Sequence, residues 1–268
     1  MSAVTSSIAA RGAWGALIAL IYLFLLAPLL VVLVISFDTR PFLAFPPAGF
    51  SFGSYIAAAK NPAFMHAFGV SVLVGLVAAL CALAAGVPAA LVLTRQRFRG
   101  REAVSTLFLS PLLVPHIVLA VGVLLVLAPM NLHDSYTGLI MAHVGVTIPY
   151  VIRTVSLSLA AVDLRCEEAA RVHGASSLTV FRRVTLPLAA PGLIAGGVIA
   201  FLVSFDEAVI ALFITSEHVR TLPLEIFKYI EFRTDPQIAA LSVLLILVSM
   251  ALMTLVERIV GLRKALRG

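Results

Sequence analysis

The chain has 268 residues, of which 61% are hydrophobic and 12% are charged, and its mean hydropathy is +1.09. This composition excludes a water-soluble globular protein, so lipid must be the solvent of many side chains. Lipid admits only helices and closed barrels, and long apolar runs without alternation favour helices. We therefore predict an all-α polytopic membrane protein.

Six apolar segments are long enough to span a bilayer, which takes about 20 residues. The first is longer than the core of a secretory signal and has no convincing cleavage site, so we expect an uncleaved first helix. Prolines within or near the spans are expected to cause simple kinks. The expected spans are Trp14–Ser36, Phe68–Thr94, Val104–Leu127, Thr137–Ala160, Pro191–Ile214 and Ile238–Val256, and the prolines are Pro28, Pro88, Pro111, Pro115 and Pro149.

The basic residues indicate the orientation of these spans. Most of them lie in the loops after the second, fourth and sixth spans, and the formal net charge is +6. Basic loops stay in the cytosol, so we expect both termini there and no nucleic-acid partner. The cluster Arg95–Arg101 is expected to anchor the chain on anionic lipid. The residues on this side are Arg11, Arg95, Arg97, Arg99, Arg101, Arg165, Arg171, Arg182, Arg183, Arg258, Arg263, Lys264 and Arg267.

Two longer segments are then expected outside the cell, Phe37–Ala67 and Thr215–Gln237. Cys81 and Cys166 fall at different membrane depths and are expected to be free thiols.

The cytosolic loop at about 161–190 carries an ordered pattern. It reads Glu168-Ala169-Ala170-Arg171, then Gly174, nine residues, and Val184-Thr185-Leu186-Pro187. Propensity favours a helix that ends at Gly174, followed by a second short helix capped by Ser176 or Ser177. Pro187 is expected to force a turn before the fifth span. Helix, glycine corner, helix and proline predict a rigid bracket.

This pattern resembles the EAA loop of the permease subunits of ATP-binding-cassette (ABC) importers, with Val184 where that family has Ile. The resemblance implies a type I permease fold, a single permease domain over 1–268 with its first helix at about 14–36 and its core at about 64–260, and a bacterial inner-membrane location. It also implies partners: a dimer of ATPase subunits, a second homologous permease and a periplasmic or lipid-anchored binding protein. The residues implied to couple to the ATPase are Glu168, Ala169, Ala170, Arg171, Gly174, Leu186 and Pro187.

The sequence contains no phosphate-binding GxxxxGK loop, so we expect the partner ATPase to bind ATP and Mg²⁺, and this chain to be no enzyme and to hold no cofactor. A membrane-embedded enzyme and a standalone channel or secondary carrier are the opposing classes. A nucleophile–base constellation would be needed for the first, and the second would need no ATPase-docking loop.

Ser204-Phe205-Asp206-Glu207 places two carboxylates in the fifth span, which we expect to continue as a helix. Charge within a membrane is costly and therefore usually functional. On a helix the two side chains point about 100° apart, so one is expected to face a cation path, with Ser204 and Phe205 beside it. His143 lies closer to these acids in membrane depth than Arg153 does, and it is their candidate partner. A structural hydrogen-bonding role for both acids stays open.

The Ser-Phe-Asp-Glu stretch resembles the spermidine/putrescine branch of the family, as do Thr221–Phe227 and Asp235–Ser242. A polyamine is the substrate that this resemblance implies, with aminoethylphosphonate, an opine or ferric iron as alternatives. Two further features have simple interpretations: Arg153 reaches toward headgroups rather than gating the path, and His116, His133 and His143 are satisfied polar positions rather than metal ligands.

Overall fold

The computed structural model describes residues 2–215, 217 and 219–265, and the side chains among these from 14 to 258. Of the residues expected to be basic and cytosolic, Arg267 and the side chains of Arg11, Arg263 and Lys264 lie outside this description. Every regular element in the described part is helical. The α-helices are α1 (Ser2–Ile35), α2 (Gly53–Lys60), α3 (Pro62–Arg95), α4 (Arg101–Leu109), α5 (His116–Leu127), α6 (Tyr136–Ala160), α7 (Leu164–Val172), α8 (Ser177–Val180), α9 (Leu186–Phe205), α10 (Val209–Ile214), α11 (Leu222–Phe232) and α12 (Pro236–Ala265), with a 3₁₀ turn at Ser110–Leu112 and a π-helix at Phe181–Thr185.

Among the described residues, five helices are long and apolar enough to cross a membrane. A sixth span is obtained when Arg101–Leu112 and His116–Leu127, which meet at 104°, are counted as one. The expected simple kink at Pro111 and Pro115 is therefore wrong, because the helix stops and restarts there. Two prolines four residues apart remove two backbone donors and disfavour helix in the residues before them. Pro28, Pro88 and Pro149 lie inside continuous helices.

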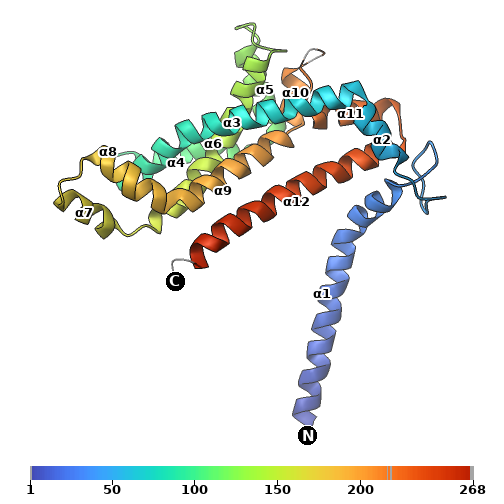
Figure 1. The fold of residues 1–268 in the computed structure, drawn as a ribbon, viewed down its shortest axis with the longest axis horizontal. Coiled ribbons are helices and arrows are strands. Elements are labelled where there is room, and N and C mark those ends of the chain that lie inside the picture. The colour runs from blue at the N-terminus through green and yellow to red at the C-terminus, as the bar shows by residue number, and fades with distance from the viewer. Residues whose placement is uncertain (1, 216, 218, 266–268) are drawn as a thin grey trace. The chain divides into compact units, whose positions relative to one another are not determined.

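The contacts divide the chain into two compact units, one up to Asn61 together with Tyr229–Leu247, and the other comprising Pro62–Lys228 and the chain from Val248. In the second unit α3, α6 and α9 pack along one another (Figure 1). Glycines permit the close approach: a Cβ on Gly192 would lie 2.2 Å from the Cβ of Ser158, and one on Gly86 would lie 2.8 Å from Cγ1 of Val151. Small residues let membrane helices pack by van der Waals contact, which matters because the hydrophobic effect does not drive helices together within a bilayer.

In the first unit, the window Trp14–Ile35 of α1 has none of its residues buried, as suits a helix solvated by lipid. The segment after it is ordered around Asp38. The Asp38 carboxylate accepts hydrogen bonds from Arg40 Nη2 at 2.6 Å and from the Ala48 N–H at 3.2 Å. The hydrogen bond from Arg40 is the main cause that lowers the pKa of Asp38 from 3.8 to about 2.

The two segments expected outside the cell also meet within this unit. The backbone N–H of Leu43 donates to the carbonyl of Thr234 at 3.1 Å. Ser216 and His218, which belong to the second expected segment, lie outside the described residues. The meeting makes one surface of two segments that lie far apart in the sequence.

Candidate functional site

The loop between α6 and α9 folds as a bracket whose corners are set by local chemistry. Asp163 accepts from the N–H of Arg165 at the start of α7. Gly174 ends that helix with φ +81°, a left-handed conformation that glycine adopts without penalty. The N–H of Gly174 bonds the carbonyl of Arg171, and the N–H of Ala175 bonds that of Ala170, which together satisfy the helix end. The expected helix end at Gly174 is confirmed.

The second arm begins as expected and then continues further than expected. The Ser176 hydroxyl accepts from the N–H of Thr179 and caps α8. The helix then runs on to Phe205 without a turn at Pro187, which corrects that expectation. The π-helix at Phe181–Thr185 ends two residues before Pro187, and its wider turn makes room for a ring that would otherwise clash with the carbonyl four residues back.

Most of the side chains that the resemblance assigns to ATPase coupling are turned outward from the bracket. Glu168, Ala169, Arg171, Gly174 and Pro187 are exposed, and Ala170 and Leu186 are half-buried. Two apolar side chains that sequence reasoning missed stand beside them: Val172 is 86% exposed and Leu178 is 64% exposed. Exposed apolar side chains that gather on one surface mark sites of contact with a protein or a membrane.

The neighbouring acid, Glu167, was also missed, and it is buried. Its carboxylate lies 2.9 Å from Arg95 Nη2 and 3.5 Å from Arg171 Nη2. The available signal was the spacing of Glu167 and Arg171, since residues four apart share one helix face. The contact with Arg95 joins residues 72 positions apart and has no local signal in the sequence.

The acidic pair of the fifth span lies in a break rather than in a continuous helix. Helix α9 ends at Phe205, and α10 begins at Val209. The Glu207 carboxylate accepts from the N–H groups of Val209 and Ile210 at 2.9 and 3.0 Å, so the side chain replaces helical carbonyls as the partner of these donors. The expected 100° relationship on one helix is therefore wrong.

The histidine partner also differs from the expectation. His116 Nδ1 lies 2.8 Å from Glu207 Oε2, whereas His143 Nδ1 lies 2.7 Å from the hydroxyl of Ser204. Glu207 is thus paired and buried, and it has the structural hydrogen-bonding role that the sequence left open. The bend before α5 places His116 at the first position of that helix, where it meets α10.

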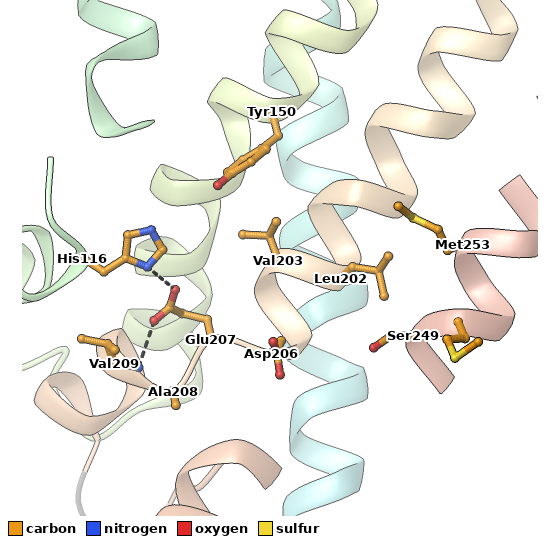
Figure 2. A pocket seen from close by; sticks show the side chains of 11 residues that line it. His116, Tyr150, Leu202, Val203, Asp206, Glu207, Ala208, Val209, Ser249 and Met253 are labelled. Atoms are coloured by element: carbon orange, nitrogen blue, oxygen red, sulfur yellow. Dashed lines mark hydrogen bonds and ion pairs between the residues drawn. The ribbon is translucent and has the colours of Figure 1, made fainter. Parts of the chain in front are cut away.

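Asp206 is exposed and lines a pocket of about 690 Å³ (Figure 2). Figure 2 shows the Glu207 carboxylate turned toward His116 and the Asp206 side chain turned away from it, in the segment between α9 and α10. Ser204 and Phe205 are buried outside this lining; the Phe205 ring stacks on that of Phe201, 5.4 Å away between centroids. The lining residues are His116, Tyr150, Leu202, Val203, Asp206, Glu207, Ala208, Val209, Ser249, Met250 and Met253.

This pocket combines one exposed carboxylate with apolar and aromatic walls. An irregular backbone at membrane depth is tolerated where it is buried in protein or lines a cavity, and the break at Asp206 meets that condition. A carboxylate attracts a cation, while the methionine and leucine side chains suit methylene groups.

Known proteins resemble this chain over most of its length. Residues 82–263 match the family described as binding-protein-dependent transport system inner membrane component. The spermidine/putrescine transport system permease protein PotC of Haemophilus influenzae is 32% identical over 239 residues, covering 89% of this chain and 93% of the relative. The putrescine transport system permease protein PotI of Escherichia coli K12 is 33% identical over 244 residues, covering 88% and 86%.

Among solved structures, the chain is similar to one from a bacterial alginate ABC transporter, determined with an alginate pentasaccharide-bound periplasmic protein. The TM-score is 0.69 at 16% identity, and the match covers 92% of this chain and 94% of the other. At that identity the likeness concerns the fold alone, which is the type I importer permease fold that the loop pattern implies.

Proposed function

The chain belongs to the binding-protein-dependent transport system inner membrane component family, the membrane permeases of ABC importers, and we propose that it forms half of a translocation path for a polyamine such as putrescine or spermidine. ATP hydrolysis in such importers lies in a separate subunit, and the chain itself is no enzyme. The observation that carries the substrate proposal is the single exposed carboxylate, Asp206, in a largely apolar pocket.

The chemistry of a polyamine suits this pocket. Its ammonium groups need a carboxylate, and the methylene segments between them need apolar or aromatic contact. Asp206 supplies the charge, and Leu202, Met250 and Met253 supply apolar contact. Glu207 is occupied by His116 and two backbone donors, so its role is to shape the path while Asp206 faces the substrate. Ser204 and Phe205 support that wall from behind.

The bracket is proposed to dock an ATPase subunit through Glu168, Ala169, Ala170, Arg171 and Gly174, with Leu186 and Pro187 framing it. Its exposed apolar pair, Val172 and Leu178, supports this assignment, because water does not favour such a surface. The full assembly would contain two ATPase subunits, which bind the ATP and Mg²⁺, and a second homologous permease. This chain would hold no cofactor of its own.

The ordered segment around Asp38 is proposed to receive a periplasmic or lipid-anchored binding protein, in a bacterial inner membrane with both termini in the cytosol. The hydrogen bonds of Arg40 and the link from Leu43 to Thr234 support a preformed surface there. A preformed surface loses little conformational entropy on binding.

Substrate choice is tested on the cognate binding protein and on the assembled importer. Calorimetry of the purified binding protein with putrescine, spermidine, aminoethylphosphonate, an opine and ferric iron should show tight binding of a polyamine alone. Uptake of radiolabelled putrescine by cells expressing the complete importer should then be inhibited by unlabelled spermidine. Tight binding of an anionic or metal ligand in place of a polyamine would refute the substrate proposal.

A further inference from the structure

Helix α7, which carries the coupling residues, is held in place by charge rather than by an apolar face. It has nine residues, and its single buried residue is Glu167. An isolated helix this short is not stable in water, so its position depends on tertiary contacts. Among the longer helices of the described chain, α3 supplies such a contact through its last residue, Arg95.

The contact is an ion network whose central pair, Glu167 and Arg95, has little access to solvent, while Arg171 is exposed. Glu167 Oε1 lies 2.9 Å from Arg95 Nη2, and Glu167 Oε2 lies 3.5 Å from Arg171 Nη2. The exposed fractions of the Arg95 and Glu167 side chains are 15% and 6%. Arg95 Nη2 also approaches the carbonyl of Val162 at 3.4 Å, on the segment that leads into α7.

We propose that Glu167 is the positioning residue that locks the coupling helix onto the cytosolic end of the second span. Motion of a docked ATPase then reaches α3 through the Glu167–Arg95 pair, in addition to reaching α9 along the chain itself. This rests on the proposed docking role of the bracket.

The pair suits this task for a physical reason. Removing one partner of a buried ion pair leaves the other charge unsolvated, which costs far more than the pair itself contributes. The Glu167–Arg95 pair is therefore either fully formed or fully broken, and partly formed states are unfavourable. Such a link moves as a unit, whereas a loose apolar contact would slide.

The two native cysteines provide the test. Cys81 lies in α3 and Cys166 lies in α7, and both are free and exposed. Spin labels on these two thiols report the distance between the two helices by pulsed electron resonance, measured on the complete importer in lipid nanodiscs. Wild type should give one narrow distance distribution.

Glu167→Gln should widen this distribution, with at least a tenfold rise in the population of detached α7, or about 1.4 kcal/mol. Arg95→Gln should do the same. The double variant should be narrower than either single variant, because no unpaired buried charge remains. Arg165→Gln, on the exposed face of α7, is the matched control and should leave the distribution unchanged.

An unchanged distribution in Glu167→Gln would overturn the proposal, and so would equal widening in the Arg165→Gln control. The distance is measured without reference to the transported solute, so it stays informative if the importer carries something other than a polyamine. A second readout is coupling: Glu167→Gln should retain ATPase subunits on co-purification while the ratio of solute imported to ATP hydrolysed falls about tenfold. Loss of ATPase subunits from wild type itself would instead count against the docking role.

Discussion

His116 Nδ1 lies 2.8 Å from Oε2 of Glu207, and this contact joins the start of α5 to the start of α10. His116 follows the break before α5, and Glu207 lies within the break between α9 and α10. The pair therefore connects two interrupted spans, and it leaves Asp206 as the exposed carboxylate beside it. Adjacent acids in the sequence thus have different physical roles.

Glu207→Ala should destabilise the protein by about 1 to 2 kcal/mol, because it removes the acceptor for two N–H groups at the start of α10. Thermal unfolding in detergent micelles measures this. His116 is 41% exposed, so the charge contribution of the pair is small. Glu207→Gln keeps one acceptor oxygen and should lose less. Equal stability of Glu207→Ala and wild type would show that α10 does not depend on this cap.

Asp206→Asn should leave folding intact and raise the apparent Michaelis constant for putrescine about tenfold or more, because a charge-assisted hydrogen bond contributes about 1.5 to 3 kcal/mol. Radiolabelled uptake in cells, normalised to the amount of protein in the membrane, provides the measurement. Asp206→Glu keeps the charge and should retain more activity. Wild-type uptake kinetics in Asp206→Asn would remove Asp206 from the path.

The sequence was sufficient for features that depend on local chemistry. The helix end at Gly174 follows from the backbone preference of glycine, and a serine cap after it follows from side-chain chemistry, although the choice of Ser176 over Ser177 came from the structure. Long apolar runs likewise located the spans. The breaks were not predictable in this way, since hydropathy does not distinguish a continuous helix from one interrupted at Asp206.

Long-range pairs also escaped sequence reasoning. His116 and Glu207 meet only because α5 packs on α10, and Glu167 meets Arg95 only because the loop after α6 brings α7 to the last residue of α3. The sequence shows each charge but not its partner. His143 was expected near the acids by depth, yet its contact is with Ser204, since depth along the membrane does not determine which face of a helix a residue occupies.

Gly192→Ala should destabilise the α3–α6–α9 bundle by about 1 to 3 kcal/mol, because overpacking forces helices apart. The added Cβ would lie 2.2 Å from the Cβ of Ser158 and 3.1 Å from the carbonyl oxygen of Thr154. Gly145→Ala is the matched control, since nothing lies within 4 Å of its added Cβ. It should be neutral or slightly stabilising. The two variants are compared by thermal unfolding, and equal midpoints would contradict the packing described here.

The segment around Asp38 should loosen in acid. Its folded pKa of about 2 lies below the ordinary 3.8, chiefly because Arg40 donates to the carboxylate. The stabilisation is therefore complete above about pH 4 and is lost as the pH falls through about 2. Hydrogen exchange of the backbone amides of residues 38–48, corrected for intrinsic rates, is compared between wild type and Asp38→Asn. The protection of these amides should differ between the two proteins at pH 6 and become equal near pH 2. A difference in protection that does not change with pH would contradict the role of the Asp38 carboxylate.

The most direct measurement is putrescine accumulation in proteoliposomes that contain this chain and its partner permease, with the binding protein supplied on the outer side, with and without the ATPase subunits. Putrescine should accumulate only when the ATPase subunits and internal ATP are both present, and it should not accumulate when this chain carries Glu168→Lys. Accumulation by the two permeases without any ATPase would contradict this coupling, because the chain would then carry solute as an autonomous transporter.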